Sequence, residues 1–176
     1  MNPVGACSQA NKANKENKSM KILFICTHNR CRSILSEAIA NHQNDSRLQA
    51  ASAGSQPVGE VHPLSLKYLA EAGISTQGLI SQSWDELETF NADVVVTVCD
   101  SAAAEACPVW FGKAIKLHWG LKDPSKVEGD EAAVKAEFLT CMAEIEARMK
   151  AITSLDLDNL KGDALKAELL KLGAQG

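Results

Sequence analysis

The residues best suited to chemistry are a cysteine and an arginine separated by five residues, Cys26 and Arg32. The stretch that joins them lies between an apolar run, residues 22–25, and a helical pattern, residues 34–40. This order predicts a strand, a tight loop and a helix, with backbone N–H groups of the loop directed at one point near the positive end of the helix. The same field favours the thiolate form of Cys26. The loop therefore offers an oxyanion site together with a nucleophile.

The residues after Cys26 are the candidate oxyanion-binding set: Thr27, His28, Asn29, Arg30, Cys31, Arg32 and Ser33. Arg32 would grip two oxygens of the anion with its planar guanidinium group. Ser33 would donate a hydrogen bond to the thiolate. Asn29 would fix the shape of the loop, because asparagine tolerates a left-handed backbone. His28 and Arg30 are expected at the rim of the site.

These residues must be positioned by a larger framework. Four runs have strand character: 22–25, 48–53, 93–98 and 114–119. Helical patterns alternate with them at 34–40, 63–72 and 129–154, with a weaker helical turn at 84–90 and a further amphipathic stretch at 162–172. The alternation predicts an α/β fold with three layers, in which a four-stranded, mostly parallel sheet has helices on both faces.

Three polar features follow strands of this sheet. Cys26 follows the first strand, Cys99 follows the third, and Asp123 comes a few residues after the fourth. Because ligands of open α/β sheets bind outside the carboxyl ends of the strands, we expect these residues to meet there. An Asp-Pro pair is often only a turn. At this edge, however, the carboxyl group of Asp123 could protonate an oxygen that a thiolate expels from an oxyanion.

The remaining cysteines leave several alternatives open. Cys99 and Cys107 are either two unrelated buried cysteines or a thiol pair that resolves a bond formed at Cys26. No Cys-x2-Cys spacing is present, which disfavours zinc and leaves no expected metal site. Alanines between Cys99 and Cys107 favour a helix, whose ends would lie about 12 Å apart, so a disulfide would require the segment to bend or unwind. Cys31 either forms a protective disulfide with Cys26 or is a packed structural thiol.

The bulk properties are those of a single compact domain. The chain has 176 residues, 45% hydrophobic, and a formal net charge of −4, which argues against general nucleic-acid binding. No run has the roughly 18 apolar residues of a membrane span, and residues 1–19 lack the apolar core of a signal peptide. We expect a disordered tail over 1–19, a catalytic domain over 20–154 and a C-terminal extension over 155–176 that includes a helix. A cytoplasmic location with reduced cysteines follows from this interpretation.

The combined motifs resemble a known family. Cys26, Arg32 and Ser33 near the start, with Asp123-Pro124 late in the chain, resemble the low-molecular-weight protein tyrosine phosphatases. With Cys99 and Cys107 added, the chain is similar to the arsenate reductases built on that fold. The likeness runs from about residue 20 to 154.

The resemblance implies a role for each of five residues. Cys26 would attack arsenate to form a thiol–arsenic adduct, Arg32 and the loop amides would bind the oxyanion, and Asp123 would protonate the leaving oxygen. Cys99 would then attack Cys26 and release arsenite, and Cys107 would move the disulfide outward to a reductant. The function implied is arsenic detoxification.

The resemblance also sets expectations for ligands and partners. No tightly bound cofactor is expected, but an external thiol reductant is, either thioredoxin or glutaredoxin with glutathione. Phosphate and sulfate would compete with arsenate. Asn29, Glu37 and Ser52 match potassium ligands of some relatives, which leaves a potassium site open. The competing interpretations are a low-molecular-weight protein tyrosine phosphatase, which needs only Cys26, Arg32 and Asp123, and a non-catalytic oxyanion or redox-sensing protein.

Overall fold

The computed structural model describes residues 19–104, 108 and 111–174. Its centre is a four-stranded sheet whose order is β2-β1-β3-β4, with every neighbouring pair parallel. The strands are β1 (Met20–Ile25), β2 (Leu48–Ala53), β3 (Val94–Thr97) and β4 (Ile115–His118). The predicted α/β fold is therefore confirmed, and the sheet is entirely parallel. Most of the predicted N-terminal tail, and Cys107, lie outside the described residues.

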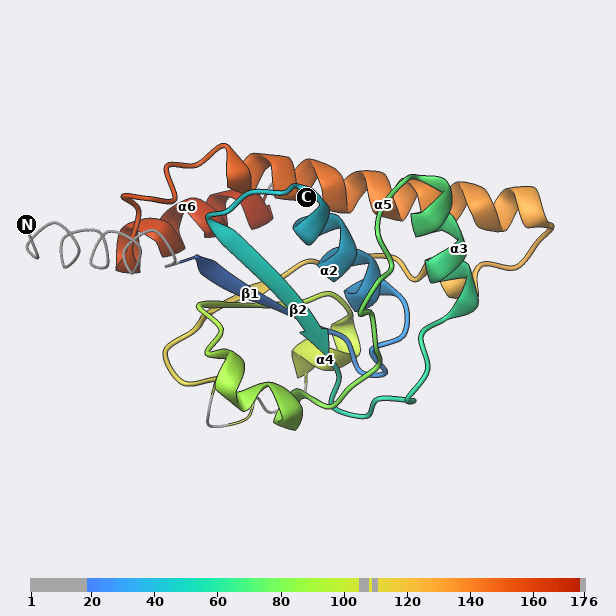
Figure 1. Ribbon diagram of the computed structural model, residues 1–176, viewed down its shortest axis with the longest axis horizontal. Helices are drawn as coiled ribbons and strands as arrows, with labels where there is room; N and C mark the ends of the chain where they lie inside the picture. The colour runs from blue at the N-terminus through green and yellow to red at the C-terminus, as the bar shows by residue number, and fades with distance from the viewer. Residues whose placement is uncertain (1–18, 105–107, 109–110, 175–176) are drawn as a thin grey trace, which may run out of the picture.

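Helices connect and cover the strands. They are α2 (Arg32–His42), α3 (Pro63–Glu71), α4 (Asp100–Ala104), α5 (Glu131–Thr153) and α6 (Gly162–Ala174), with 3-10 turns η1 (Trp84–Phe90) and η3 (Pro124–Lys126). Figure 1 shows α2 and α5 on one side of the sheet and α4 and η1 on the other. The C-terminal helix α6 packs against β4 and α5, within the segment where the sequence favours a helix.

The apolar runs of the sequence become the two central strands. Residues 22–25 of β1 and 94–96 of β3 are almost completely buried, as a strand covered on both faces must be. The observed boundaries differ from the expected ones by one or two residues. β1 begins at Met20, since the N–H of Met20 donates to the carbonyl oxygen of Arg47 and extends the pairing with β2. α2 begins at Arg32, so the arginine of the reactive loop belongs to the first turn of the helix.

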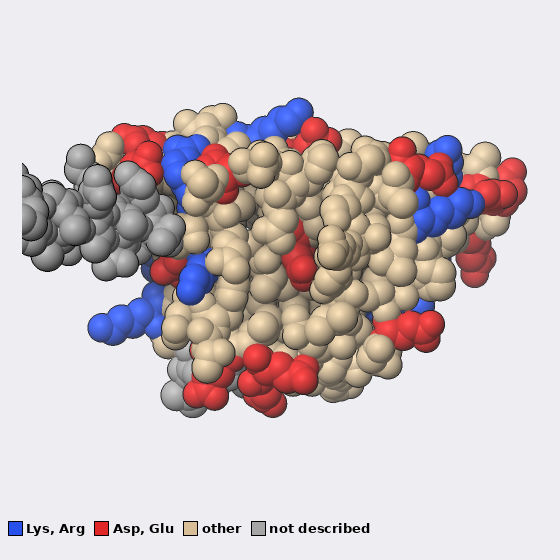
Figure 2. Space-filling view, in the orientation of Figure 1, with Lys and Arg blue, Asp and Glu red and all other residues tan. Residues whose placement is uncertain are grey.

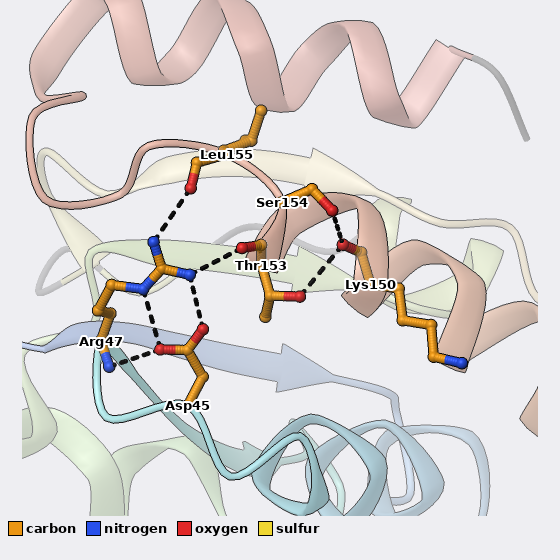
Figure 3. Close-up of polar contacts among 6 residues, drawn as sticks. All are labelled: Asp45, Arg47, Lys150, Thr153, Ser154 and Leu155. Carbon is orange, nitrogen blue, oxygen red and sulfur yellow. Dashed lines mark hydrogen bonds and ion pairs between the residues drawn. The ribbon is translucent and has the colours of Figure 1, made fainter.

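At the amino end of the sheet, an arginine fixes the end of α5 (Figure 3). The guanidinium group of Arg47 donates to the carbonyl oxygens of Thr153 at 2.7 Å and Leu155 at 3.2 Å, and its other edge pairs with Asp45. The carbonyl group of Thr153, at the end of the helix, lacks a partner within the helix, and the arginine supplies one. Leu155 lies just beyond the helix, and its carbonyl oxygen also accepts from the N–H of Leu157. The contact lies at the end of the sheet opposite the reactive loop.

Charged side chains on the face shown in Figure 2 are of both signs and lie mainly at its margin, whereas its centre is mostly uncharged. No helix in the described part of the chain has both the length and the apolar character needed to cross a bilayer.

Candidate functional site

The reactive loop connects β1 to α2, and its carbonyl groups are tied away from its centre. The carbonyl oxygens of Thr27, His28 and Arg30 accept hydrogen bonds from the N–H groups of Gln56, Val58 and His62, respectively. Because the C=O and N–H groups of one peptide unit point in opposite directions, these bonds turn the following N–H groups toward the inside of the loop. The first turn of α2 also has no side-chain cap at its N-terminus. The loop can therefore direct several N–H donors at an oxyanion.

A glycine at the end of β2 allows the loop to approach closely. A Cβ atom at Gly54 would lie 2.5 Å from the carbonyl oxygen of Thr27 and 2.7 Å from that of Cys26. Both neighbours are backbone atoms, so neither can move without moving the loop. Gly54 thus sets the distance between the reactive loop and the strand beside it.

Asn29 holds the loop from within, as its residue type suggested. Its φ is 47°, in the left-handed region, and its side chain is completely buried. The amide nitrogen donates to the hydroxyl groups of Ser33 at 2.7 Å and Ser52 at 3.0 Å, while the amide oxygen accepts from the N–H of Gln82 at 2.9 Å. Nothing in the local sequence pointed to Gln82, which is 53 residues away.

We expect Asn29→Ala to lower the free energy of unfolding by about 2–4 kcal/mol, because it leaves buried groups unpaired and places alanine in a left-handed conformation. Urea denaturation would measure the loss. Asn91→Ala is the matched control: Asn91 also has a positive φ, 55°, but is exposed. It should lose only about 1 kcal/mol, because its side chain makes a single exposed hydrogen bond, to the carbonyl oxygen of Thr89, and the backbone contribution dominates. Equal losses in the two variants would contradict the role assigned to the buried bonds.

Arg32 and Asp123 lie side by side beneath the loop. The guanidinium Nη1 of Arg32 donates to the carbonyl oxygen of Leu121 at 3.1 Å, and its Nη2 lies 3.4 Å from Asp123 Oδ2. The Nε of Arg32 is buried and has no hydrogen-bond partner in the described part of the chain, which leaves a donor available to an anion. Asp123 caps η3, where its Oδ1 accepts from the N–H and the hydroxyl of Ser125.

Cys26 and Cys99 are buried and in contact, although 73 residues separate them in the sequence. The pKa of Cys99 is lowered to about 5, chiefly by a hydrogen bond from the thiol of Cys26 and also by the backbone N–H groups of Thr27 and Ala102. The Thr27 hydroxyl also lies 3.7 Å from Cys99 Sγ. The same contact, followed by burial, raises the pKa of Cys26 above its ordinary value, so the prediction that the loop favours the thiolate form of Cys26 is wrong for the free protein. Since two adjacent sulfurs cannot both be ionised, the pair shares one negative charge, which the N–H donors around Cys99 favour on that sulfur.

The lowered pKa predicts that Cys99 stays ionised at a pH at which ordinary thiols are protonated. An ordinary thiol has a pKa near about 8.5 and is almost fully protonated at about pH 6, whereas Cys99 should remain ionised there. The ultraviolet absorbance of thiolates, followed during acid titration, should show one group that protonates near pH 5. The Cys26→Ala variant serves as the comparison, because removal of the donor thiol should move that titration to higher pH. An unchanged titration in Cys26→Ala would contradict the shared charge.

The residues around these groups form a cleft of about 250 Å³ at the carboxyl end of the sheet. Its lining is Cys26, Thr27, His28, Arg30, Cys31, Arg32, Cys99, Ser101, Asp123, Ser125 and Lys126. Cys26, Cys99 and Asp123, which the sequence placed after three different strands, therefore meet in one cleft, as predicted. Asn29 and Ser33 lie behind the cleft rather than in it.

Cys31 lines the same cleft, but its thiol is packed and protonated rather than ionised like that of Cys99. It is 3% exposed, and burial raises its pKa to about 11. Ser101, Ser125 and Lys126 line the cleft but were not expected there. The Asp-Pro-Ser pattern was a usable signal for Ser125, because an aspartate before proline is suited to capping a short helix through the residue after it.

Glu37, matched to potassium ligands, is linked to the loop through Ser52. The hydroxyl of Ser52 donates to Glu37 Oε1 at 2.7 Å, and burial raises the pKa of this glutamate. A half-buried carboxylate beside a hydroxyl oxygen suits a monovalent cation, whereas Asn29 turns its amide nitrogen toward Ser52 and its oxygen toward Gln82. Glu37 and Ser52 therefore fit the ion better than Asn29 does. Among the described residues, no three His, Cys, Asp or Glu side chains are grouped to hold a metal.

Comparison with known proteins gives consistent matches. The model of a family described as low molecular weight phosphotyrosine protein phosphatase matches residues 21–167, which include the reactive loop, Cys99 and Asp123. An arsenate reductase of Bacillus licheniformis is 36% identical over 129 residues, covering 73% of this chain and 91% of the relative. A protein of Synechocystis sp. named glutaredoxin arsenate reductase is 30% identical over 133 residues, covering 74% of this chain and 93% of the relative.

Among solved structures, the arsenate reductase from Archaeoglobus fulgidus superposes with a TM-score of 0.63 at 27% sequence identity. The match covers 76% of this chain and 99% of that one. The family resemblance that the motifs carry is thus confirmed along most of the chain, and the part of α6 beyond residue 167 lies outside the family match.

Proposed function

This chain belongs to the low molecular weight phosphotyrosine protein phosphatase family, and we propose that it is an arsenate reductase that uses Cys26, Cys99 and Cys107 in turn. The observation that carries the proposal is the buried contact between the thiols of Cys26 and Cys99. A phosphatase needs only the nucleophile, the arginine and the acid. A second thiol with a lowered pKa beside the nucleophile has a use where a bond at Cys26 must be broken by another sulfur.

In the proposed reaction, arsenate binds to the N–H groups of the loop and to Arg32. The shared proton passes to Cys99, and the Cys26 thiolate attacks arsenic. An As–S bond forms and an As–O bond breaks, while Asp123 gives a proton to the departing hydroxyl group, which leaves as water. Preorganised N–H donors and the guanidinium group stabilise the charge that develops on the oxygens.

The second step transfers electrons. Cys99 gives to solvent the proton that it took up and, again as thiolate, attacks Cys26 Sγ, so that a disulfide forms and the As–S bond breaks. Its electron pair stays on arsenic, which is reduced from As(V) to As(III) and leaves as arsenite. Cys107 then attacks Cys99 Sγ, which frees the Cys26 thiolate and leaves a Cys99–Cys107 disulfide. An external dithiol or glutathione supplies the two electrons that reduce this disulfide.

The proposal extends to partners and setting. Either thioredoxin, or glutaredoxin with glutathione, is the reductant, and the name of the Synechocystis relative supports the second option. Phosphate and sulfate compete with arsenate, since they share its shape and charge. A reducing cytoplasm suits free thiols. Potassium, where bound, would be held by Glu37 and Ser52 and would supply positive charge beside the loop. No cofactor is needed for the steps above.

The deciding experiment is a coupled assay of NADPH oxidation with arsenate, run in parallel with the thioredoxin system and with glutathione, glutaredoxin and glutathione reductase. We expect arsenate-dependent oxidation with at least one system. The ratio of kcat/KM for arsenate and for an aryl phosphate would then separate a reductase from a phosphatase. Efficient hydrolysis of the aryl phosphate, with no arsenate-dependent oxidation in either system, would overturn the proposal in favour of a phosphatase.

A further inference from the structure

One histidine, His118, makes hydrogen bonds on both sides of Cys99. It is the last residue of β4, next to β3, and its Nδ1 lies 2.8 Å from the hydroxyl and 3.1 Å from the carbonyl oxygen of Thr97. Its Nε2 lies 2.9 Å from Oδ1 of Asp100, the first residue of α4. Thr97 and Asp100 flank the turn that carries Cys99. A single imidazole ring therefore spans the turn from which the second thiolate must attack.

The donors and acceptors of this contact are compatible with either charge state of the ring. A carboxylate only accepts, so the Nε2 of His118 carries a hydrogen and donates to Asp100. In the neutral ring, the Thr97 hydroxyl donates to Nδ1. In the protonated ring, Nδ1–H donates to the Thr97 carbonyl oxygen instead. The turn is held in both cases.

The contact between His118 and Asp100 lies at the protein surface, beside Gly120 and outside the cleft. The nearest atoms to a Cβ built at Gly120 are His118 Nε2 at 3.6 Å and Asp100 Oδ1 at 3.7 Å, so the glycine borders the pair. The Asp100 side chain is 93% exposed, and an ion pair so open to water adds little to stability. Neither residue lines the cleft that contains Cys26. We therefore expect the contact between His118 and Asp100 to affect the position of Cys99 rather than the stability of the fold.

We propose that His118 is a positioning residue for the second thiolate: its bonds to Thr97 and Asp100 hold Cys99 Sγ toward Cys26, which determines how fast Cys99 displaces arsenic. This inference rests on the proposed function, since it concerns the step in which the Cys26–Cys99 disulfide forms. The orientation of a reacting group strongly affects the rate constant, because a small displacement removes the near-attack geometry. Aryl phosphate hydrolysis, in which Cys99 is not a reactant, should not be slowed by the loss of His118, and would rise if the contact that raises the pKa of Cys26 is weakened.

The test measures both reactions of Cys26 in the same variants of the full chain. In a single turnover with arsenate, the Cys26–Cys99 disulfide is trapped by acid quench and quantified by peptide mass mapping. We expect His118→Ala to slow its formation about 10- to 100-fold, whereas aryl phosphate hydrolysis should be as fast as in wild type or faster. Asp100→Ala removes the same bond from an exposed side chain and should reproduce most of the effect, whereas Asp100→Asn, which keeps an acceptor, should restore most of the rate.

Lys116→Ala is the matched control, because Lys116 is another exposed residue of β4 and its ammonium group donates to the carbonyl oxygen of Gly112. The double variant His118→Ala/Asp100→Ala should be no slower than His118→Ala alone, since both remove one contact. Additive effects, or equal slowing of aryl phosphate hydrolysis and disulfide formation, would overturn the positioning role. So would an unchanged disulfide rate in both single variants. If the wild-type chain itself forms no Cys26–Cys99 disulfide with arsenate, the proposed function fails, and this inference with it.

Discussion

Replacing Cys26 with serine should lower arsenate-dependent NADPH oxidation by a factor of at least about 10⁴. A serine hydroxyl is nearly the same size as the thiol but is not ionised at neutral pH, so no nucleophile remains for arsenic. Aryl phosphate hydrolysis should fall to a similar degree, because both reactions begin at the same sulfur. The coupled assay and release of a chromogenic phenol measure the two losses.

The appropriate control is Cys141→Ser on α5. Cys141 is as buried as Cys26, 5% exposed against 6%, but does not line the cleft. Burial raises its pKa to about 12, so it is not a thiolate at neutral pH. We expect this variant to lose some stability and to keep its kcat. Retention of more than about 1% of either activity by Cys26→Ser, at a level above contaminating enzyme, would show that another group attacks the substrate.

The framework of the site could be predicted because its signals are local. Apolar runs marked the strands, and the helix expected over 63–72 is α3, which has Pro63 in its first turn and Gly73 just after its end, as suits these two residue types. The order of strand and helix then placed Cys26, Cys99 and Asp123 at one edge of the sheet without any knowledge of their contacts. Such reasoning needs only the direction of each strand.

The contacts that shape the site could not be predicted in this way, because they join residues distant in sequence. Gln82 binds Asn29 through its backbone, a group that every residue type except proline offers. The carbonyl oxygen of Leu121, which accepts from Arg32, is equally independent of side-chain type. His118 and Asp100 are ordinary surface residues in the sequence, and only the register of β3 and β4 brings them together.

Replacing Cys99 with serine should affect arsenate reduction and aryl phosphate hydrolysis in opposite directions. Cys99→Ser should lower arsenate turnover by at least about 10³, because a hydroxyl group cannot form the disulfide that releases arsenite. Aryl phosphate hydrolysis should persist and is expected to rise at neutral pH. The hydrogen bond to Cys99 is the largest cause of the raised pKa of Cys26, so its loss lowers that pKa and increases the thiolate fraction of the nucleophile.

Two measurements on the Cys99→Ser variant test whether Cys99 takes part in arsenate reduction and whether it raises the pKa of Cys26. The coupled assay with arsenate should fall to background, and the pH profile of aryl phosphate hydrolysis should shift its lower limb toward acid relative to wild type. The direction follows from the removal of an interaction that stabilises the protonated form of Cys26. Multiple turnover of arsenate by Cys99→Ser would eliminate the relay, because electrons would then reach arsenic without the second sulfur. A limb shifted toward alkaline pH would instead show that Cys99 lowers the pKa of Cys26, and that the shared charge rests on the other sulfur.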